Sequence, residues 1–337
     1  MTNAPTQRTL EFTPLTGTGL QTSELQFGTW RFGRVNEAGE TEIDESRAHA
    51  LLDAYADAGG RYIDTADVYG GGSCERWIGD WLAERDRERY TIASKIYWQI
   101  RDGDPNSRGT NRKNVRDRID ALLDRLDTDY VDVLYIHRWD DQTDARELMK
   151  TLDGLVESGR VHYLGASTHR PNAWKVARAN EIARANGWEP FTVLQPRYNL
   201  VDREIEGDYL AFARQQGLAV CPWSPLGQGF LTGKYDRDAD VPADSKVAAS
   251  RRFRESYLTP ENFDVHEELN AVAAAVDATP AQVALAWLCH RDGVTAPIVG
   301  ARTVEQLHEN LAAASIDLSP AQVDRLTAAK AGPYDGL

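Results

Sequence analysis

The sequence is poor in the residues that build disulfide frameworks and metal clusters. Its 337 residues include only three cysteines, Cys74, Cys221 and Cys289, which lie far apart and form no CxxC pair. A disulfide scaffold or a cysteine-based zinc site is therefore not indicated. Three separate thiols in a reducing compartment are the simpler interpretation, and we expect no metal.

Long apolar runs and an excess of positive charge are also missing. No segment approaches 18 consecutive apolar residues, and the opening MTNAPTQRTLEF lacks the basic and then apolar pattern of a secretion signal. The 52 acidic and 38 basic residues give a net charge of −14, which argues against nucleic acid or an anionic membrane as partner. We expect a soluble cytoplasmic protein that acts on a small molecule. The sequence carries no signal of its oligomeric state.

What the sequence does contain is a regular alternation of short apolar runs and amphipathic helical patterns. Helical patterns lie, for example, at 44–59, 111–126, 144–159 and 303–314. The expected strands are 24–30, 61–65, 90–96, 130–137, 161–167, 191–196, 218–223 and 296–301. Eight strands alternating with helices favour an α/β fold with a parallel sheet, closed as a (β/α)8 TIM barrel.

A doubly wound sheet is the alternative fold. The first strand is followed by GTWRFGR and not by a glycine pattern that opens a helix, so no Rossmann fingerprint is present there. Residues 10–25 have the Thr and Gly turn chemistry of a β-hairpin, and we expect this N-terminal hairpin to plug the bottom of the barrel. Extra helices are expected near the C-terminus, at 264–276 and 280–290.

The domain organisation follows from the same pattern. We expect a single barrel domain over residues 11–330, with flexible termini at 1–10 and 331–337. The long segments 97–111 and 224–262 are interpreted as loops that decorate the rim of the barrel.

Polar and aromatic residues stand where the predicted strands end. The carboxyl ends of the strands of a parallel barrel converge on one face, where function is located. The residues at these ends are Trp30, Asp64, Lys95, His137, Ser167, Gln195, Trp223 and Gly300. Each alone has an ordinary structural explanation, such as a turn cap for Asp64 or a satisfied imidazole for His137. Jointly they predict a functional site.

An acid, a phenol, an amine and an imidazole make up a device for proton transfer. Tyr69 lies in the turn five residues after Asp64. A Lys95 ammonium near the phenol is expected to lower the pKa of Tyr69, and the Asp64 carboxylate would hold that ammonium. His137 can donate a hydrogen bond to a substrate oxygen while the phenol delivers a proton to it. Such a set needs a partner that supplies hydride. We also expect Ser73 to cap the helix that follows this turn.

These residues lie in motifs that resemble the aldo-keto reductase family. The motifs are YIDTADVYG, ASK, LYIH, LGAST, LQPRYN, CPWSPLGQGFLTGKY and IVGARTVEQLHENL, spread from about residue 11 to 330. The resemblance implies a catalytic tetrad of Asp64, Tyr69, Lys95 and His137, with Tyr69 as the general acid. It implies an NADPH-dependent reductase of aldehydes or ketones, reversible to an alcohol dehydrogenase.

The resemblance also implies a nicotinamide cofactor site. Ser167 and Gln195 would hydrogen-bond the carboxamide, and Trp223 would stack on the ring. Gln306, Glu309 and Asn310 match the family's adenosine contacts. The remaining positions implied by the resemblance are Gly28, Thr29, Trp30, Thr168, Ser224, Pro225, Leu226, Gly227, Gly229 and Gly300.

Cofactor choice depends on three cations. The loop LTGKYDRDADVPADSK resembles the branch of the family that includes the potassium-channel β subunits, and Lys234 and Lys246 match that branch's basic contacts. Together with Arg302 they would favour the 2′-phosphate of NADPH. NADH is the alternative cofactor.

Four aromatic residues on the loops after successive strands are candidate walls of the substrate pocket, namely Trp30, Phe32, Trp98 and Trp139. They favour a partly apolar carbonyl compound. Arg138, beside His137, is a candidate for binding an anionic group, with pairing to a surface acid as the other interpretation.

Two other functions compete with the reductase. A redox-sensing subunit that binds the cofactor as a signal, like the channel β subunits, is disfavoured because some members of that branch lack the tetrad histidine, whereas His137 is present here. A Schiff-base aldolase would use Lys95 as its nucleophile, but Asp64 and Tyr69 would then share no role.

Overall fold

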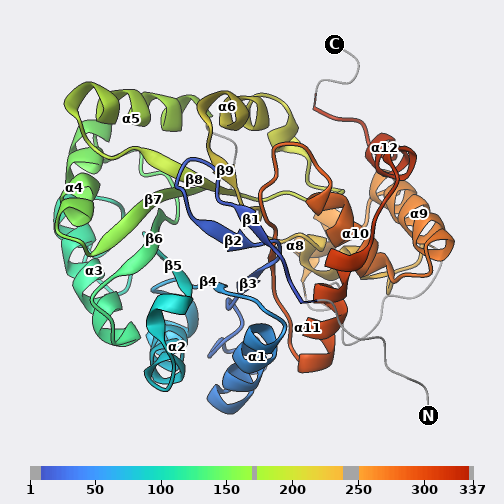
Figure 1. Ribbon diagram of the computed structural model, residues 1–337, viewed down its shortest axis with the longest axis horizontal. Helices are drawn as coiled ribbons and strands as arrows, with labels where there is room; N and C mark the ends of the chain where they lie inside the picture. Colours follow the sequence, from blue (N-terminus) through green and yellow to red (C-terminus); the bar gives the residue numbers. More distant parts are fainter. Residues whose placement is uncertain (1–8, 169–172, 238–249, 334–337) are drawn as a thin grey trace.

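Eight parallel strands form one sheet in the order β10-β3-β4-β5-β6-β7-β8-β9 (Figure 1). The computed structural model describes residues 9–168, 173–237 and 250–333. All neighbouring strands in this order pair in parallel. The strands are β3 (Gln26–Gly28), β4 (Tyr62–Asp64), β5 (Thr91–Ile96), β6 (Val131–Ile136), β7 (Val161–Thr168), β8 (Phe191–Pro196), β9 (Ala219–Val220) and β10 (Ile298–Val299). Every predicted strand is present.

The sheet curls until its two outer strands meet. Beside β9 and β10, the Thr295 amide donates to the Val220 carbonyl at 2.8 Å, and the Ile298 amide donates to the Pro222 carbonyl at 2.9 Å. A closed sheet has no free edge, which removes a site of aggregation. The fold is the (β/α)8 barrel that the alternating pattern predicts.

Helices surround the strands on the outside of the ring (Figure 1). They are α1 (Glu45–Asp57), α2 (Ser73–Ala83), α3 (Arg112–Leu126), α4 (Ala145–Glu157), α5 (Ala173–Asn186), α6 (Tyr209–Gln216), α8 (Arg251–Tyr257), α9 (Pro260–Ala275), α10 (Pro280–Cys289), α11 (Val304–Leu311) and α12 (Pro320–Ala328). Asp44, Asn111 and Asp144 cap α1, α3 and α4 by accepting bonds from backbone amides of the first turn. These caps explain why the helices begin within a residue of the predicted positions.

The extra helices are placed near the C-terminus, as the sequence predicts. Both α9 and α10 start with a Thr cap followed by proline, a favourable pair at the first helical position. Over the described residues, no single helix combines the length and apolarity needed to cross a membrane. The bent pair of α9 and α10, at 95° to each other, meets that test only when taken together.

Two hydrophobic clusters fill the barrel and its helical layer. The larger lies between strands and helices, and the smaller fills the barrel interior around Tyr62 and Tyr135. Leu15 joins the interior cluster from the turn between β1 (Phe12–Pro14) and β2 (Gln21–Ser23), and it is 1% exposed. The predicted hairpin therefore plugs one end of the barrel. Leu10, just before the hairpin, is also buried.

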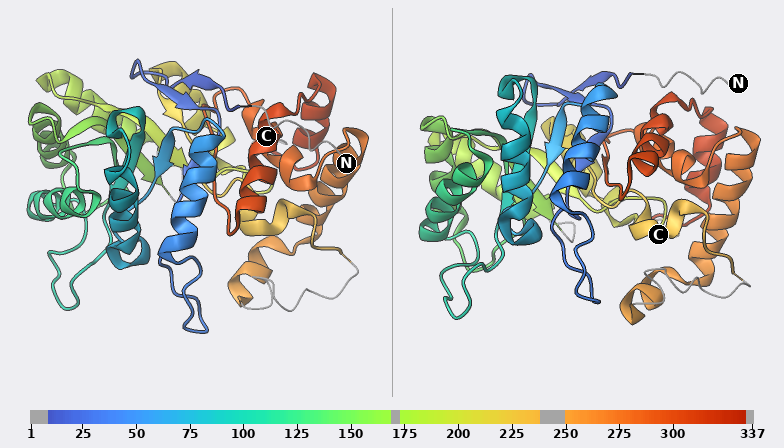
Figure 2. Two further views of the ribbon diagram at one scale, coloured as in Figure 1. Left: turned by 60° about the horizontal axis from the view of Figure 1, so that its bottom comes forward. Right: turned by 90° about the horizontal axis from the view of Figure 1, so that it is seen from below.

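The opposite end of the barrel carries the long loops. Figure 2 shows the β1–β2 hairpin at one end and the loops that follow β3 and β5 extending from the other. The carboxyl ends of all eight strands open toward these loops, because the strands are parallel. A site built from strand ends thus lies away from the hairpin plug.

Candidate active site

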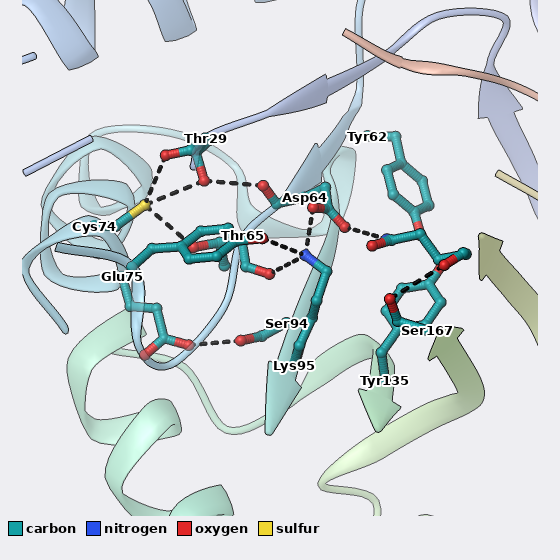
Figure 3. Close-up of polar contacts among 12 residues, drawn as sticks. Thr29, Tyr62, Asp64, Thr65, Cys74, Glu75, Ser94, Lys95, Tyr135 and Ser167 are labelled. Atoms are coloured by element: carbon teal, nitrogen blue, oxygen red, sulfur yellow. Dashed lines mark hydrogen bonds and ion pairs between the residues drawn. The ribbon is translucent and has the colours of Figure 1, made fainter. Parts of the chain in front are cut away.

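The predicted tetrad residues come together where β4, β5 and β6 end. Asp64 is the last residue of β4, Lys95 lies near the end of β5, and His137 directly follows β6. The Lys95 ammonium donates to the Asp64 carboxylate at 2.5 Å and to the Thr65 carbonyl at 2.6 Å (Figure 3). It also donates to the Tyr69 hydroxyl at 3.4 Å. One buried cation thus joins the acid and the phenol.

The turn that carries Tyr69 depends on glycine. The 3₁₀ helix η1 (Tyr69–Gly72) contains Gly70 at φ 56° and Gly71 at φ 64°, a left-handed backbone that favours glycine. Gly72, at φ 91°, occupies the N-cap position of α2. Ser73 is instead the first helical residue, and its hydroxyl donates to the Gly70 carbonyl at 2.6 Å. The prediction that Ser73 is the cap is wrong, because the glycines carry the chain into the helix one residue earlier.

Asp64 is fully engaged on both carboxylate oxygens. Its second oxygen accepts a hydrogen bond of 2.6 Å from the Gln195 side chain, and only 4% of Asp64 is exposed. Burial raises the pKa of Asp64, and the bonds from Lys95 and Gln195 oppose that rise. With Lys95 1% exposed, the pair is a buried and hydrogen-bonded ion pair.

Tyr69 departs from the expected direction of its pKa. Burial, followed by the negative charge of nearby Asp64, raises the pKa of Tyr69 well above its usual value. The expected lowering by Lys95 is not found, because the ammonium lies closer to Asp64 and the Thr65 carbonyl than to the phenol. The phenol is therefore neutral at physiological pH, which is the form that a proton donor needs.

A cavity of about 880 Å³ opens beside these residues. Asp64, Tyr69 and His137 line it, and Lys95 lies behind them. The rings of Tyr69 and His137 meet edge to face, with centroids 5.9 Å apart. A phenol and an imidazole therefore face one space that is large enough for a cofactor together with a small ligand.

Most of the residues expected around the cofactor also line this cavity. They are Gly28, Trp30, Ser167, Gln195, Trp223, Ser224, Pro225, Leu226, Gly229, Lys234, Gly300, Arg302, Gln306, Glu309 and Asn310. The Ser167 hydroxyl donates to the Gln195 carbonyl at 3.1 Å, across the paired strands β7 and β8. This bond, to the main-chain carbonyl, orients the Ser167 hydroxyl, and the Gln195 side chain is held by its bond to Asp64.

The residues present fit an elongated dinucleotide. Ser224, Gln228 and Gly229 have positive φ, so the chain makes a tight loop along the cavity wall. At the far end, the Asn310 side chain donates to the Gly300 carbonyl at 3.2 Å. The Gln306 side chain accepts from the Arg302 amide at 3.0 Å. Helix α11 thereby holds the loop after β10. Amides, an aromatic ring, a tight loop and cations all line this one cavity, and these are groups that can hold a nicotinamide dinucleotide.

Two expected cofactor residues do not line the cavity. Thr29 is fully buried, and its hydroxyl donates to the Asp64 carbonyl at 2.9 Å, so its side chain supports the strand end instead. Gly227 is buried within the loop, near Tyr257. Only the backbone of Thr168 is described, and Lys246 lies outside the described residues.

The expected substrate pocket needs three corrections. Trp30 and Trp98 line the cavity, but Phe32 is 1% exposed in the hydrophobic core, where it packs against Phe27. Trp139 also packs against the core and does not line the cavity. Arg138 is exposed beside Trp98 and outside the cavity lining. Aromatic side chains near strand ends point in more than one direction, and the amino-acid sequence alone does not predict which.

Several residues that line the cavity were not predicted from the sequence. Arg31 and Arg34 line the cavity, as do Val68 and Gln228. Both arginines follow Trp30 in GTWRFGR, directly after the first barrel strand. Their position in the loop that follows a barrel strand could have indicated that they face the site, since such loops surround the site in every barrel of this kind.

A barrel with a buried Lys–Asp pair, a phenol and an imidazole beside a large cavity has the proton-transfer groups that an oxidoreductase of carbonyl or alcohol groups needs. The aldo/keto reductase family matches residues 24–331, and the chain belongs to this family. The family uses nicotinamide cofactors.

Relatives from fungi extend this similarity over nearly the whole chain. A norsolorinic acid reductase of Aspergillus flavus is 32% identical, over 94% of this chain and 79% of the relative. An aryl-alcohol dehydrogenase of Pestalotiopsis microspora is 34% identical, over 91% of this chain and 78% of the relative. An aldo-keto reductase of Emericella nidulans is 34% identical, with the same coverage of 91% and 78%.

Proposed function

We propose that this protein reduces aldehydes or ketones with NADPH and that Tyr69 donates the proton. The observation that carries the proposal is the contact of the buried Lys95 ammonium with both Asp64 and the Tyr69 hydroxyl, beside a cavity that His137 also faces. The relatives named as reductases and as an alcohol dehydrogenase support a reaction between carbonyl and alcohol groups that runs in either direction.

The four residues divide the proton transfer between them. His137 donates a hydrogen bond to the substrate oxygen and orients it. Tyr69, neutral because its pKa is raised, gives its proton to that oxygen as negative charge develops there. The Lys95 ammonium, 3.4 Å from the phenol oxygen, then stabilises the phenolate that remains. Asp64 balances the charge of Lys95 and keeps it in place.

A reduced nicotinamide, when bound, supplies the hydride to the carbonyl carbon. In this proposal Ser167 and Gln195 hold its carboxamide, and Trp223 packs on its ring. Small residues of the 224–229 loop lie along the pyrophosphate. Lys234 and Arg302, which line the cavity, recognise the 2′-phosphate that distinguishes NADPH from NADH.

The alternative function is a sensor that binds the cofactor with little turnover, as in the channel β-subunit branch. The Lys234 loop supports that likeness, whereas the edge-to-face placement of His137 against Tyr69 supports catalysis. A cofactor-bound sensor needs no aligned proton donor.

The experiment that tests the proposal mixes the purified protein with NADPH and a panel of aldehydes and ketones and follows the absorbance of the reduced nicotinamide. We expect turnover of part of the panel, and a lower KM for NADPH than for NADH. Tight NADPH binding without turnover of any carbonyl would favour the sensor, and equal use of both cofactors would refute the 2′-phosphate assignment.

A further inference from the structure

Two cations in the cavity wall have no part in the proposed reduction. The chain has a net charge of −14, yet Arg31 and Arg34 line the cavity together with Trp30, in addition to Lys234 and Arg302. Arg31 follows Trp30 directly, and Arg34 comes three residues later in the same loop after β3. In an acidic protein, a cavity wall with paired guanidinium groups indicates a ligand that carries negative charge.

The loop with Arg34 is fixed against the turn with Tyr69. Gly33 and Gly70 both have left-handed backbones, at φ 66° and 56°. A Cβ added to Gly70 would lie 2.6 Å from the Phe32 carbonyl oxygen and 3.0 Å from Gly33 Cα, so the two backbones are in direct contact. Arg34 follows Gly33 and Tyr69 precedes Gly70. The backbone of each residue therefore lies one residue from this contact.

The two arginines share a single carboxylate. Glu42 faces Arg34 across the loop, with its amide donating to the Arg34 carbonyl at 2.8 Å. Its carboxylate accepts bonds from Arg34 at 2.5 Å and from Arg31. Burial, and then repulsion by Arg302, lowers the pKa of Arg31, and the positive charge of Arg34 adds to that repulsion. One carboxylate between two guanidinium groups leaves an excess of positive charge that an anionic ligand would compensate.

One aromatic ring lies beside the Arg34 guanidinium, and a second lines the same cavity. Arg34 lies over the Trp30 ring at 4.1 Å from its centroid, and the Trp30 side chain remains 41% exposed. Trp98 also lines the cavity, where its ring meets that of His137 edge to face with centroids 6.2 Å apart. Flat walls next to the proton donor suit a flat ligand, because aromatic rings stack or meet edge to face.

The geometry points to an anion subsite at Arg34, which makes aromatic aldehydes or ketones that carry a carboxylate the preferred substrates. The ring lies between the tryptophan walls, its carbonyl faces Tyr69 and His137, and its carboxylate binds the guanidinium of Arg34. This inference rests on the proposed reductase function. It replaces Arg138, which is exposed and outside the cavity lining, as the residue that recognises an anion.

The test compares 4-formylbenzoate with its neutral methyl ester, which has the same ring and the same aldehyde. We expect wild-type kcat/KM to favour the acid, chiefly through KM, by about tenfold to a hundredfold, the range of a charge-assisted hydrogen bond. Arg34→Met should remove this preference, and Arg34→Lys should restore part of it. Arg138→Met is the matched control, because Arg138 also lies near a tryptophan ring, 5.8 Å from the centroid of Trp98, but outside the cavity lining. It should keep the preference.

Binding measurements separate the possible failures. Tryptophan fluorescence gives the affinity of the NADP⁺ complex for 4-formylbenzoate, which cannot be reduced there, and the affinity of the free protein for NADPH. Binding that depends on Arg34 in a protein that turns over neither aldehyde would support the subsite and refute the reductase. Turnover of both aldehydes without preference would refute the subsite and leave the reductase standing. A loss of NADPH affinity in Arg34→Met, with the acid preference intact, would assign Arg34 to the cofactor and overturn the inference.

Discussion

Asp64 and Asp67 lie three residues apart in the sequence, and each forms a buried ion pair. Only one of the two pairs faces the cavity. Asp64 pairs with Lys95 at the cavity wall, where the ammonium also reaches Tyr69. Asp67 pairs with Arg118 of α3, behind the strand ends, where both side chains are almost completely buried. The pairs are alike in chemistry and differ in access to a ligand.

The pleat of β5 separates the two environments. Figure 3 shows neighbouring Ser94 and Lys95 directed to different partners, with Ser94 donating to Glu75 at 2.6 Å and Lys95 to Asp64. Successive side chains of a strand point to opposite faces, so one enters the barrel and the next the helical layer. Glu75 in turn accepts from Arg125 at 2.8 Å, and the charges of Glu75 and Arg125 act on Asp67. Asp67, Glu75, Arg118 and Arg125 thus form an outer cluster, whereas Asp64 and Lys95 form the inner pair. We infer that the inner pair performs chemistry and the outer cluster holds the layer of α2 and α3 in place.

The largest expected effect is at the inner site. Tyr69→Phe removes the proton donor and should lower kcat by about 10²- to 10⁴-fold, the usual contribution of a general acid. Cofactor affinity, followed by fluorescence titration, should stay near the wild-type value because the ring is retained. Substantial turnover in this variant would remove Tyr69 from the acid role.

A substitution in the outer cluster should lower the stability of the fold and change catalysis little. Arg118→Met leaves the Asp67 carboxylate buried without its partner, and we expect the free energy of unfolding to fall by about 3–5 kcal/mol. Urea unfolding measures the loss, and the kcat of the remaining folded protein should change far less than in Tyr69→Phe. Unchanged stability would show that the outer pair does not hold the layer.

Substitution of the cations proposed to bind the 2′-phosphate should have a smaller effect, on cofactor affinity. Arg302→Ala or Lys234→Ala should weaken NADPH binding by about tenfold while changing NADH binding little, because only NADPH carries the 2′-phosphate. Equal losses for the two cofactors in a binding titration would contradict this assignment.

A further effect concerns the pH dependence of stability at Asp67. Burial raises the pKa of Asp67 to about 7, although Arg118 opposes the rise. A carboxyl with a raised folded pKa binds its proton more tightly in the native state, so stability should fall as pH rises from about 4 to 7, by at most about 1.4 kcal/mol per pH unit for one proton. Asp67→Asn should flatten this slope in unfolding measurements across that range. A slope that is unchanged in the variant would assign it to other groups.

Much of the site was predictable because a parallel barrel turns strand ends into neighbours. Asp64, Lys95 and His137 stand at such ends, and the alternation of strands and helices was enough to find them. Direction within a loop was not predictable: Phe32 packs into the core, whereas Arg34, two residues later, lines the cavity.

Properties that depend on the folded environment, such as a pKa or a helix cap, could not be predicted from the sequence either. The raised pKa of Tyr69 results from burial and from how Lys95 divides its bonds, neither of which composition reveals. The capping role expected of Ser73 failed because Gly72 takes the left-handed position before the helix. The extent of the domain, expected at residues 11–330, stays a prediction.

The most direct test of the account compares two isosteric changes, Asp64→Asn and Asp67→Asn, with kcat measured per folded molecule at saturating NADPH. Asp64→Asn should lower kcat by about tenfold or more, because Lys95 loses the charge that holds it beside Tyr69. Asp67→Asn should keep kcat close to wild type while it alters stability. Equal losses of kcat, or a larger loss in Asp67→Asn, would contradict the claim that the cavity-facing pair carries the proton transfer.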